Sequence, residues 1–255
     1  MHGLANNPQN GTVYAATHTG LFRLGAVVPR RVNQPDGVNR FPDTMGFAVI
    51  GPNRFLASGH PGPGEGGPSN VGLLRSEDGG RTWVAVALPG QADFHALSVA
   101  GETVYGWDSA TAAVMRSDDT GTTWQRGAHL PDVGSLAVDP DHLRRVLATT
   151  ATGLLRSDDG GNTFALAPVQ PPQPLVVLDH APRTGGGGDT VLAGMDRTGT
   201  VWTSIDGTWS RGGSIGRTPQ AFSVLGPQRY VVATDDGVHS TEDTGRTWKL
   251  LAASS

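Results

Sequence analysis

Short apolar runs recur along the chain, each bounded by Gly, Pro, Asn, Asp or Ser, which is the pattern of β-strands joined by tight turns. The runs fall into three sets of six, so the chain is predicted to repeat one unit six times. First strands are predicted at 2–5, 45–49, 95–99, 134–138, 175–178 and 221–224. Second strands, which end in small residues, are predicted at 13–18, 55–60, 104–108, 146–150, 191–196 and 230–235. Third strands are predicted at 20–24, 72–76, 113–117, 153–157, 200–204 and 237–241.

A polar octet with the pattern [ST]-x-D-x-G-x-T-[WF] follows most of the third strands. Complete copies are Ser76–Trp83, Ser117–Trp124, Ser157–Phe164 and Thr241–Trp248, and a copy shortened by two residues is Ser204–Trp209. The closing aromatic residues are spaced by 41, 40, 45 and 39 positions. This spacing matches one four-stranded propeller blade of about 40 to 45 residues. The first of the six repeats has the same predicted strands as the others but lacks the octet.

The octets resemble the Asp box, or BNR repeat, and the chain resembles the Asp-box β-propellers. That superfamily includes sialidases, the sortilin-type ectodomain, photosystem II assembly factors and bacterial proteins often labelled glycosyl hydrolase. The resemblance implies an all-β, six-bladed β-propeller with Asp boxes in the turns between third and fourth strands. We expect one propeller over 1–255, with blades at approximately 2–43, 44–92, 93–131, 132–172, 173–217 and 218–254. The turn chemistry of Asp and Gly indicates that the octets are folding devices and not catalytic groups.

Composition removes several classes of function. The chain has no cysteine, which excludes disulfides and thiolate chemistry. Its 19 basic residues are scattered and its net charge is −4, so we expect no nucleic-acid partner. No apolar run reaches the length of about 18 residues that a membrane span requires. We expect a monomer that is cytoplasmic as written, or secreted or periplasmic if an export signal has been trimmed.

The start of each first strand and the turn after each second strand are expected to share one end of a propeller, at the mouth of its channel. Four of the eight histidines occupy such positions in the first three blades, and they are His2, His18, His60 and His95. Asp93, Asp108 and Met45 are expected nearby. Further candidate ligand-binding residues are Trp107, Glu65, Asp196 and Asp235. Glu65 belongs to the Gly-rich segment 60–70, which is predicted to be either a lid or a plain insertion.

Three functions remain open for these residues. Imidazoles suit a transition metal, so His2, His18, His60 and His95 are predicted to bind Cu or Zn, or a small ligand in its place. Alternatively, His18, His95, Asp93 and Asp108 carry the acid–base chemistry of a small-molecule hydrolase or condensing enzyme. The third possibility is a non-catalytic module that assembles with protein partners, as photosystem assembly factors do.

Sialidase activity is not predicted. Sialidases carry a Phe-Arg-Ile-Pro motif, an arginine triad and a Tyr nucleophile paired with Glu. Phe22-Arg23-Leu24-Gly25 resembles the motif only superficially, since its Arg recurs in the other third strands. The three tyrosines occupy equivalent second-strand positions, which a packing role explains. A different glycosidase would need two carboxylates about 5 to 10 Å apart, and Asp93 and Asp108 are the candidates.

Overall fold

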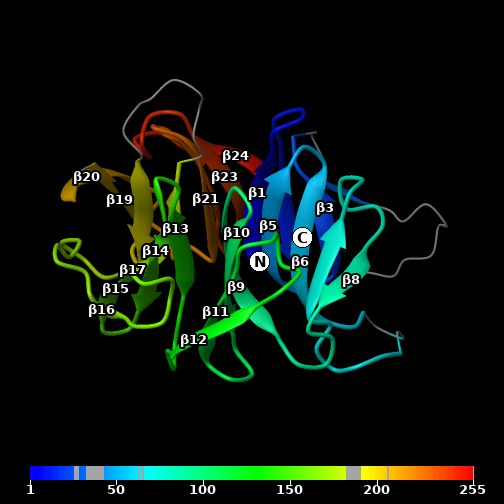
Figure 1. Cartoon of the computed structure of the whole chain (residues 1–255). Helices are drawn as coiled ribbons and strands as arrows, with labels where there is room; N and C mark the ends of the chain where they lie inside the picture. Colours follow the sequence, from blue (N-terminus) through cyan, green and yellow to red (C-terminus); the bar gives the residue numbers. More distant parts are fainter. Residues whose placement is uncertain are drawn as a thin grey trace. The chain divides into compact units, whose positions relative to one another are not determined.

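The computed structural model describes residues 1–25, 29–32, 43–62, 64, 66–181, 191–205 and 207–254. These residues form an all-β fold of six four-stranded antiparallel sheets, each built from four consecutive strands (Figure 1). This is the predicted six-bladed β-propeller, with one sheet per blade. The described residues contain no helix, and therefore none of the length and apolarity that a membrane crossing needs.

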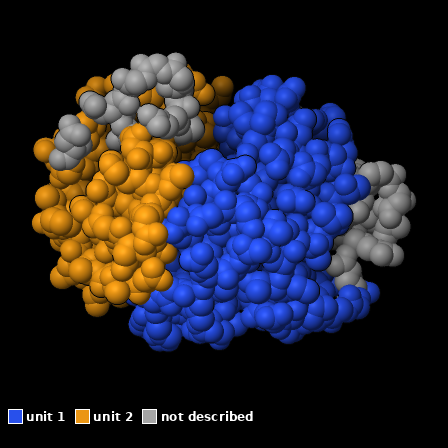
Figure 2. Space-filling model, in the orientation of Figure 1, with its two compact units in different colours: residues 1–131 blue, residues 132–255 orange. Residues whose placement is uncertain are grey.

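The chain divides into two compact units, Met1–Pro131 and Asp132–Ser255 (Figure 2). Each unit contains three of the sheets. The strands of the first unit are β1 (Gly3–Asn7), β2 (Thr12–Thr17), β3 (Gly20–Arg23), β4 (Arg30–Arg31), β5 (Asp43–Gly51), β6 (Arg54–His60), β7 (Leu73–Ser76), β8 (Val84–Ala87), β9 (Phe94–Ala100), β10 (Thr103–Asp108), β11 (Ala113–Ser117) and β12 (Gln125–His129). The strands of the second unit are β13 (Ser135–Asp139), β14 (His142–Thr150), β15 (Gly153–Ser157), β16 (Ala165–Leu166), β17 (Leu175–His180), β18 (Leu192–Asp196), β19 (Thr200–Ile205), β20 (Thr208–Ser214), β21 (Ala221–Gly226), β22 (Arg229–Ala233), β23 (Gly237–Thr241) and β24 (Lys249–Ala253).

The fourth strand is the least buried strand of each sheet. In the third sheet every residue of β10 is buried, whereas no residue of β12 is. The apolar side chains of β10 therefore pack on both faces, and β12 forms a solvent-facing edge. The second strands read as nearly continuous apolar runs in the sequence for this reason.

The first strands of neighbouring sheets lie side by side within each unit. In the first unit β5 packs against both β1 and β9, and in the second unit β17 packs against both β13 and β21. Gly46 permits the contact between β5 and β9, because a Cβ atom at this position would lie 2.4 Å from the backbone oxygen of Phe94. Side chains from the ends of different blades are thereby brought to one place.

The octets form compact turns that also join neighbouring sheets. In the second blade Asp78 Oδ1 accepts hydrogen bonds from Ser76 Oγ and Thr82 N, and Asp78 Oδ2 accepts one from Thr82 Oγ1. Trp83 donates its indole N–H to the oxygen of Gly80 and packs on a core cluster that includes residues of the first blade. The octet is thus a folding device, as its turn chemistry predicts.

These turns give the protein a specific response to acid. Hydrogen bonds from the side chain and backbone of Thr247 and from the side chain of Thr241 lower the pKa of Asp243 from 3.8 to about 2. The folded protein therefore favours the ionised carboxylate more than the unfolded chain does. This contribution to stability is complete above about pH 4 and is lost as the pH falls toward about 2.

We expect Asp243→Asn to unfold several degrees below the wild type near neutral pH, because the amide cannot accept the bond from Thr247 Oγ1. The difference in melting temperature should shrink as the pH falls from about 4 to about 2. Thermal unfolding followed by circular dichroism across this range measures the effect. Glu242→Gln, an exposed neighbour in the same octet, is the matched control and should show no such pH-dependent gap. A gap for Asp243→Asn that is constant over the whole range would contradict the interpretation.

Candidate functional site

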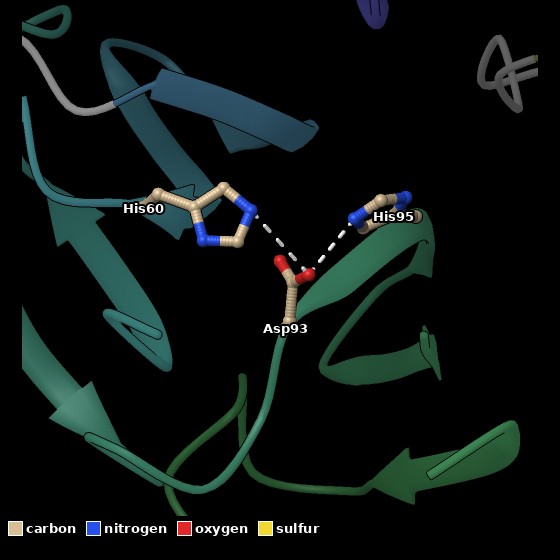
Figure 3. A group of neighbouring side chains, drawn as sticks. All are labelled: His60, Asp93 and His95. Carbon is tan, nitrogen blue, oxygen red and sulfur yellow. Dashed lines mark hydrogen bonds and ion pairs between the residues drawn. The ribbon is translucent and has the colours of Figure 1, made fainter. Parts of the chain in front are cut away.

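Three side chains of the first unit, His60, Asp93 and His95, form a compact ionisable cluster (Figure 3). One ring nitrogen from each histidine and one carboxylate oxygen all lie within 4.8 Å of one another. His95 Nε2 lies 2.9 Å from Asp93 Oδ2, and His60 Nε2 lies 3.6 Å from the same oxygen. Elsewhere in the described chain no set of three His, Cys, Asp or Glu side chains meets this criterion. We call these three residues the His–Asp–His group.

The packing of β9 beside β6 builds this group. His60 ends β6, while Asp93 and His95 flank Phe94, the first residue of β9. The backbone N–H of Phe94 donates to Ser58 Oγ at 3.0 Å, and this bond joins the start of β9 to the end of β6. Residues more than 30 positions apart in the sequence are thereby held at one site.

Asp93 is a buried carboxylate, and one of its two oxygens has no hydrogen-bond partner. Its side chain is 8 % exposed, and Oδ2 accepts hydrogen bonds from His95 and from Ser109 Oγ at 2.8 Å. The other oxygen, Oδ1, is buried and has no hydrogen-bond partner. Burial by itself would raise the pKa of Asp93, but the bonds from His95 and Ser109 and the nearby imidazoles outweigh it and hold the pKa below its usual value.

Asp108, which was predicted to be catalytic, is engaged by the protein itself. Its side chain is almost fully buried, Oδ1 accepts hydrogen bonds from the N–H groups of Asp93 and Ala110, and Oδ2 accepts one from Thr111 Oγ1. Asp108 therefore fixes the turn after β10 and the position of Asp93. These contacts favour a structural role over proton transfer to a substrate.

A second pair of histidines lies in the same unit but makes different contacts. His2 Nε2 is 2.8 Å from His18 Nε2, and His18 Nδ1 is 2.7 Å from Asp43 Oδ1. Burial, the positive chain terminus, His18 and, least of all, His95 lower the pKa of His2 to about 4, and Asp43 opposes them. His2 is consequently a neutral imidazole at physiological pH.

The structure thus distributes the four predicted metal ligands over two groups. His60 and His95 share Asp93, whereas His2 and His18 contact each other and Asp43. The other candidates of this unit are placed around them. Met45 is half-buried in β5, and Trp107 is buried with its ring 6.3 Å from that of His95 and its indole N–H bound to Leu130 O.

The remaining candidate ligand-binding residues are Asp196, Asp235 and Glu65. Asp196 and Asp235 belong to the second unit. The carboxylate of Asp196 accepts bonds from Thr198, from the N–H of Thr200 and from the indole of Trp202, while exposed Asp235 pairs with Arg217. Glu65 lies outside the described residues, so its predicted role is not placed.

The second unit also contains a cavity of about 800 Å³ that the sequence did not reveal. Polar and charged residues of its wall include Asp132, Gln173, Asp196, Arg197, Thr198 and Arg211. Gln173 and Pro174, from the Pro-rich segment 171–174, also line this cavity. The predicted strand ends account for part of the wall, namely Gly134, Thr150, Leu175 and Asp196, whereas Arg211 comes from the fourth strand, β20.

The sequence matches no family model. It is similar to two curated xyloglucanases, with 29 % identity over 179 residues to that of Hypocrea jecorina and 29 % over 163 residues to that of a Paenibacillus species. The aligned parts are 66 % and 59 % of this chain but only 20 % and 14 % of those proteins. The chain thus spans a fifth or less of the length of the curated relatives it matches.

Solved structures share the fold at lower identity. The GH74 enzyme of Niastella koreensis has a TM-score of 0.64 at 17 % identity, over 98 % of this chain and 44 % of that one. YCF48 bound to a D1 peptide has a TM-score of 0.54 at 14 % identity, over 97 % of this chain and 80 % of that one. Both are β-propeller structures, and at these identities the likeness concerns the fold alone.

The division of the histidines into two groups can be tested by titration. In His18→Ala we expect the pKa of His2 to rise from about 4, because the variant removes the electrostatic effect by which His18 lowers it. Long-range ¹H–¹⁵N correlation spectra of the imidazole nitrogens measure this value. His60→Ala is the control and should leave His2 unchanged, since His60 is not among the groups that shift it. A rise in His60→Ala but not in His18→Ala would refute the pairing.

Proposed function

We propose that this protein is a hydrolase-type β-propeller that acts on a saccharide, with His95 as the proton-transferring residue and Asp93 as its positioning residue. The observation that carries the proposal is the 2.9 Å contact between His95 Nε2 and the buried carboxylate of Asp93. Such a pair resembles the base and orienting residue of the catalytic dyads and triads of hydrolases.

The contact determines what each nitrogen of His95 can do. The Asp93 carboxylate accepts hydrogen bonds, so the neutral imidazole places its proton on Nε2 and leaves a lone pair on Nδ1. The His95 side chain is 32 % exposed, and substrate can therefore reach it. In hydrolysis Nδ1 would take a proton from the attacking water, whose oxygen bonds to the reacting carbon. His95 would then give the proton to the glycosidic oxygen as the bond between that oxygen and the reacting carbon breaks, so the leaving group departs as a hydroxyl.

The substrate class comes from the similar proteins. The curated relatives are xyloglucanases, and their similarity extends over 163 to 179 residues of this chain. A pair of carboxylates is the usual device for glycosidic bonds, but here Asp108 is engaged by the turn after β10. Xyloglucan and its oligosaccharides are accordingly the first substrates to assay, and the proposed chemistry depends on His95.

Loss of the dyad should reduce hydrolysis. We expect His95→Ala and Asp93→Asn each to lower kcat/KM on xyloglucan oligosaccharides by about 10²- to 10⁴-fold, because both disrupt positioned proton transfer. Release of reducing ends by metal-free protein measures the rate, and circular dichroism verifies the fold. His142→Ala is the matched control, since His142 also contacts a carboxylate, at 3.3 Å from Asp139, but in the second unit. Equal activity in the wild type and both dyad variants would refute the proposal.

The cavity of the second unit favours a second candidate function, which is saccharide binding without chemistry. Arg211, Gln173 and Thr198 offer donors and acceptors for sugar hydroxyls, and the mostly buried Trp202 contributes an apolar wall. The cavity volume of about 800 Å³ lies in the usual range for ligand sites. Similar proteins that act on a polysaccharide make such a ligand the natural choice.

We expect Gln173→Ala and Arg211→Ala each to weaken the binding of xyloglucan oligosaccharides by about threefold to tenfold, the effect of one lost hydrogen bond. Isothermal titration calorimetry measures the affinity. Arg229→Ala, an exposed arginine of β22 that does not line the cavity, should bind as the wild type does. Unchanged affinity in both cavity variants would remove this candidate and leave the dyad proposal intact.

We also propose that the chain belongs to the Asp-box superfamily that its octets resemble. Ser, Asp and Thr in the octets make one repeated network, which Ser117, Asp119 and Thr123 illustrate in the third blade. Ser157, Asp159 and Thr163 repeat it in the fourth blade. The repetition supports a shared origin of the blades but carries no information about substrate.

A further inference from the structure

We propose that the His–Asp–His group binds one divalent transition-metal ion, with two imidazoles and one carboxylate as ligands. This differs from the set of four histidines that the sequence suggested. The proposal uses the same residues as the hydrolase dyad, but it does not depend on hydrolase activity.

Two of the three donor pairs are close to the separation that a metal would require, and the third pair, between the two imidazoles, lies within 4.8 Å. Bonds of about 2.0 to 2.2 Å in tetrahedral geometry place two ligand atoms about 3.4 Å apart. Asp93 Oδ2 lies 2.9 Å from His95 Nε2 and 3.6 Å from His60 Nε2. Shifts of a few tenths of an ångström in the side chains would bring these pairs to the required distances.

The unpaired carboxylate oxygen of Asp93 is an independent indication of a ligand. Asp93 Oδ1 is buried without a hydrogen-bond partner, on a side chain that is only 8 % exposed. Leaving a buried charged acceptor unsatisfied costs free energy, and such groups in folded proteins usually have a partner. Figure 3 shows both carboxylate oxygens of Asp93 facing the space between the two imidazole rings. A cation held by both oxygens of the carboxylate would give Oδ1 the partner that it lacks.

His60 is already held in the form that a metal ligand needs. Its Nδ1 lies 3.0 Å from the backbone oxygen of Ser69, which can only accept a hydrogen bond, so Nδ1 carries the proton. In the neutral form of the ring Nε2 has the lone pair, and this atom faces Asp93. Donation from the outer nitrogen to a carbonyl is the usual support of a metal-bound histidine. Ser109 Oγ supports Asp93 in the same way.

The donor set selects the class of ion. Two imidazoles with one carboxylate suit Zn²⁺ or Fe²⁺ and leave coordination positions open for water or a ligand. The group contains no sulfur ligand, which disfavours Cu(I). In the dyad, Nε2 of His95 carries the proton that is donated to Asp93. A metal ion would have to bind this same atom, so the metal-bound and dyad states exclude each other.

The test is metal titration of the full chain, purified without a histidine tag and treated with chelator. We expect one Zn²⁺ per chain by calorimetry, and visible absorption bands of low-coordinate Co²⁺ when that ion is added. His60→Gln and His95→Gln should each weaken Zn²⁺ binding at least tenfold and abolish the Co²⁺ bands. Both side chains are 30 to 40 % exposed, so these variants should fold, which thermal unfolding of the metal-free proteins verifies.

Two control variants separate this group from other histidines. His18→Ala removes the partner of His2, and His142→Ala removes a histidine that contacts Asp139 in the second unit. Neither should change the affinity or the Co²⁺ spectrum. Absence of stoichiometric binding by the wild type, or loss of binding in His18→Ala but not in His60→Gln, would overturn the proposal. Neither result bears on the hydrolase proposal, which the assay of reducing ends tests. Failure of that assay would likewise leave the metal proposal unaffected.

Discussion

The packing of β1, β5 and β9 beside one another is the constraint on which the candidate site depends. β5 can approach β9 because Gly46 has no side chain, and the hydrogen bond from Phe94 N to Ser58 Oγ then fixes the start of β9 beside β6. The His–Asp–His group is a consequence of this contact, since its members come from two different blades. A change that separated these strands would disperse the group without altering any of its residues.

The fold could be predicted from the sequence because its signals are local. Each strand is a short apolar run, and each octet closes its own turn through contacts within a few residues, as Asp78 does with Ser76 and Thr82. The regular spacing of these strands and octets along the sequence then indicates six similar blades. No long-range information is needed until the sheets pack.

The site could be predicted only in part, because its chemistry depends on contacts between blades. Strand positions put His60, Asp93 and His95 at adjacent blade ends, and the structure brings these three side chains together. The same positions could not show that His18 turns toward His2 and Asp43, since that choice depends on side-chain rotamers and burial. Nor could they reveal the cavity of the second unit, where Gln173 comes from a segment that has the composition of a linker.

Hydrogen bonding to the carboxylates distinguishes Asp93 from the aspartates that fix turns. Asp243 and Asp108 each receive bonds on both oxygens from nearby N–H and O–H groups, and such carboxylates have little left to offer a ligand.

Asp93 is different, because every bond it accepts falls on Oδ2 while Oδ1 stays buried and unpaired. A folding role does not account for that asymmetry, since an unpaired buried oxygen only destabilises the fold. The proposed cation site would account for the asymmetry, because a bound ion would give Oδ1 a partner.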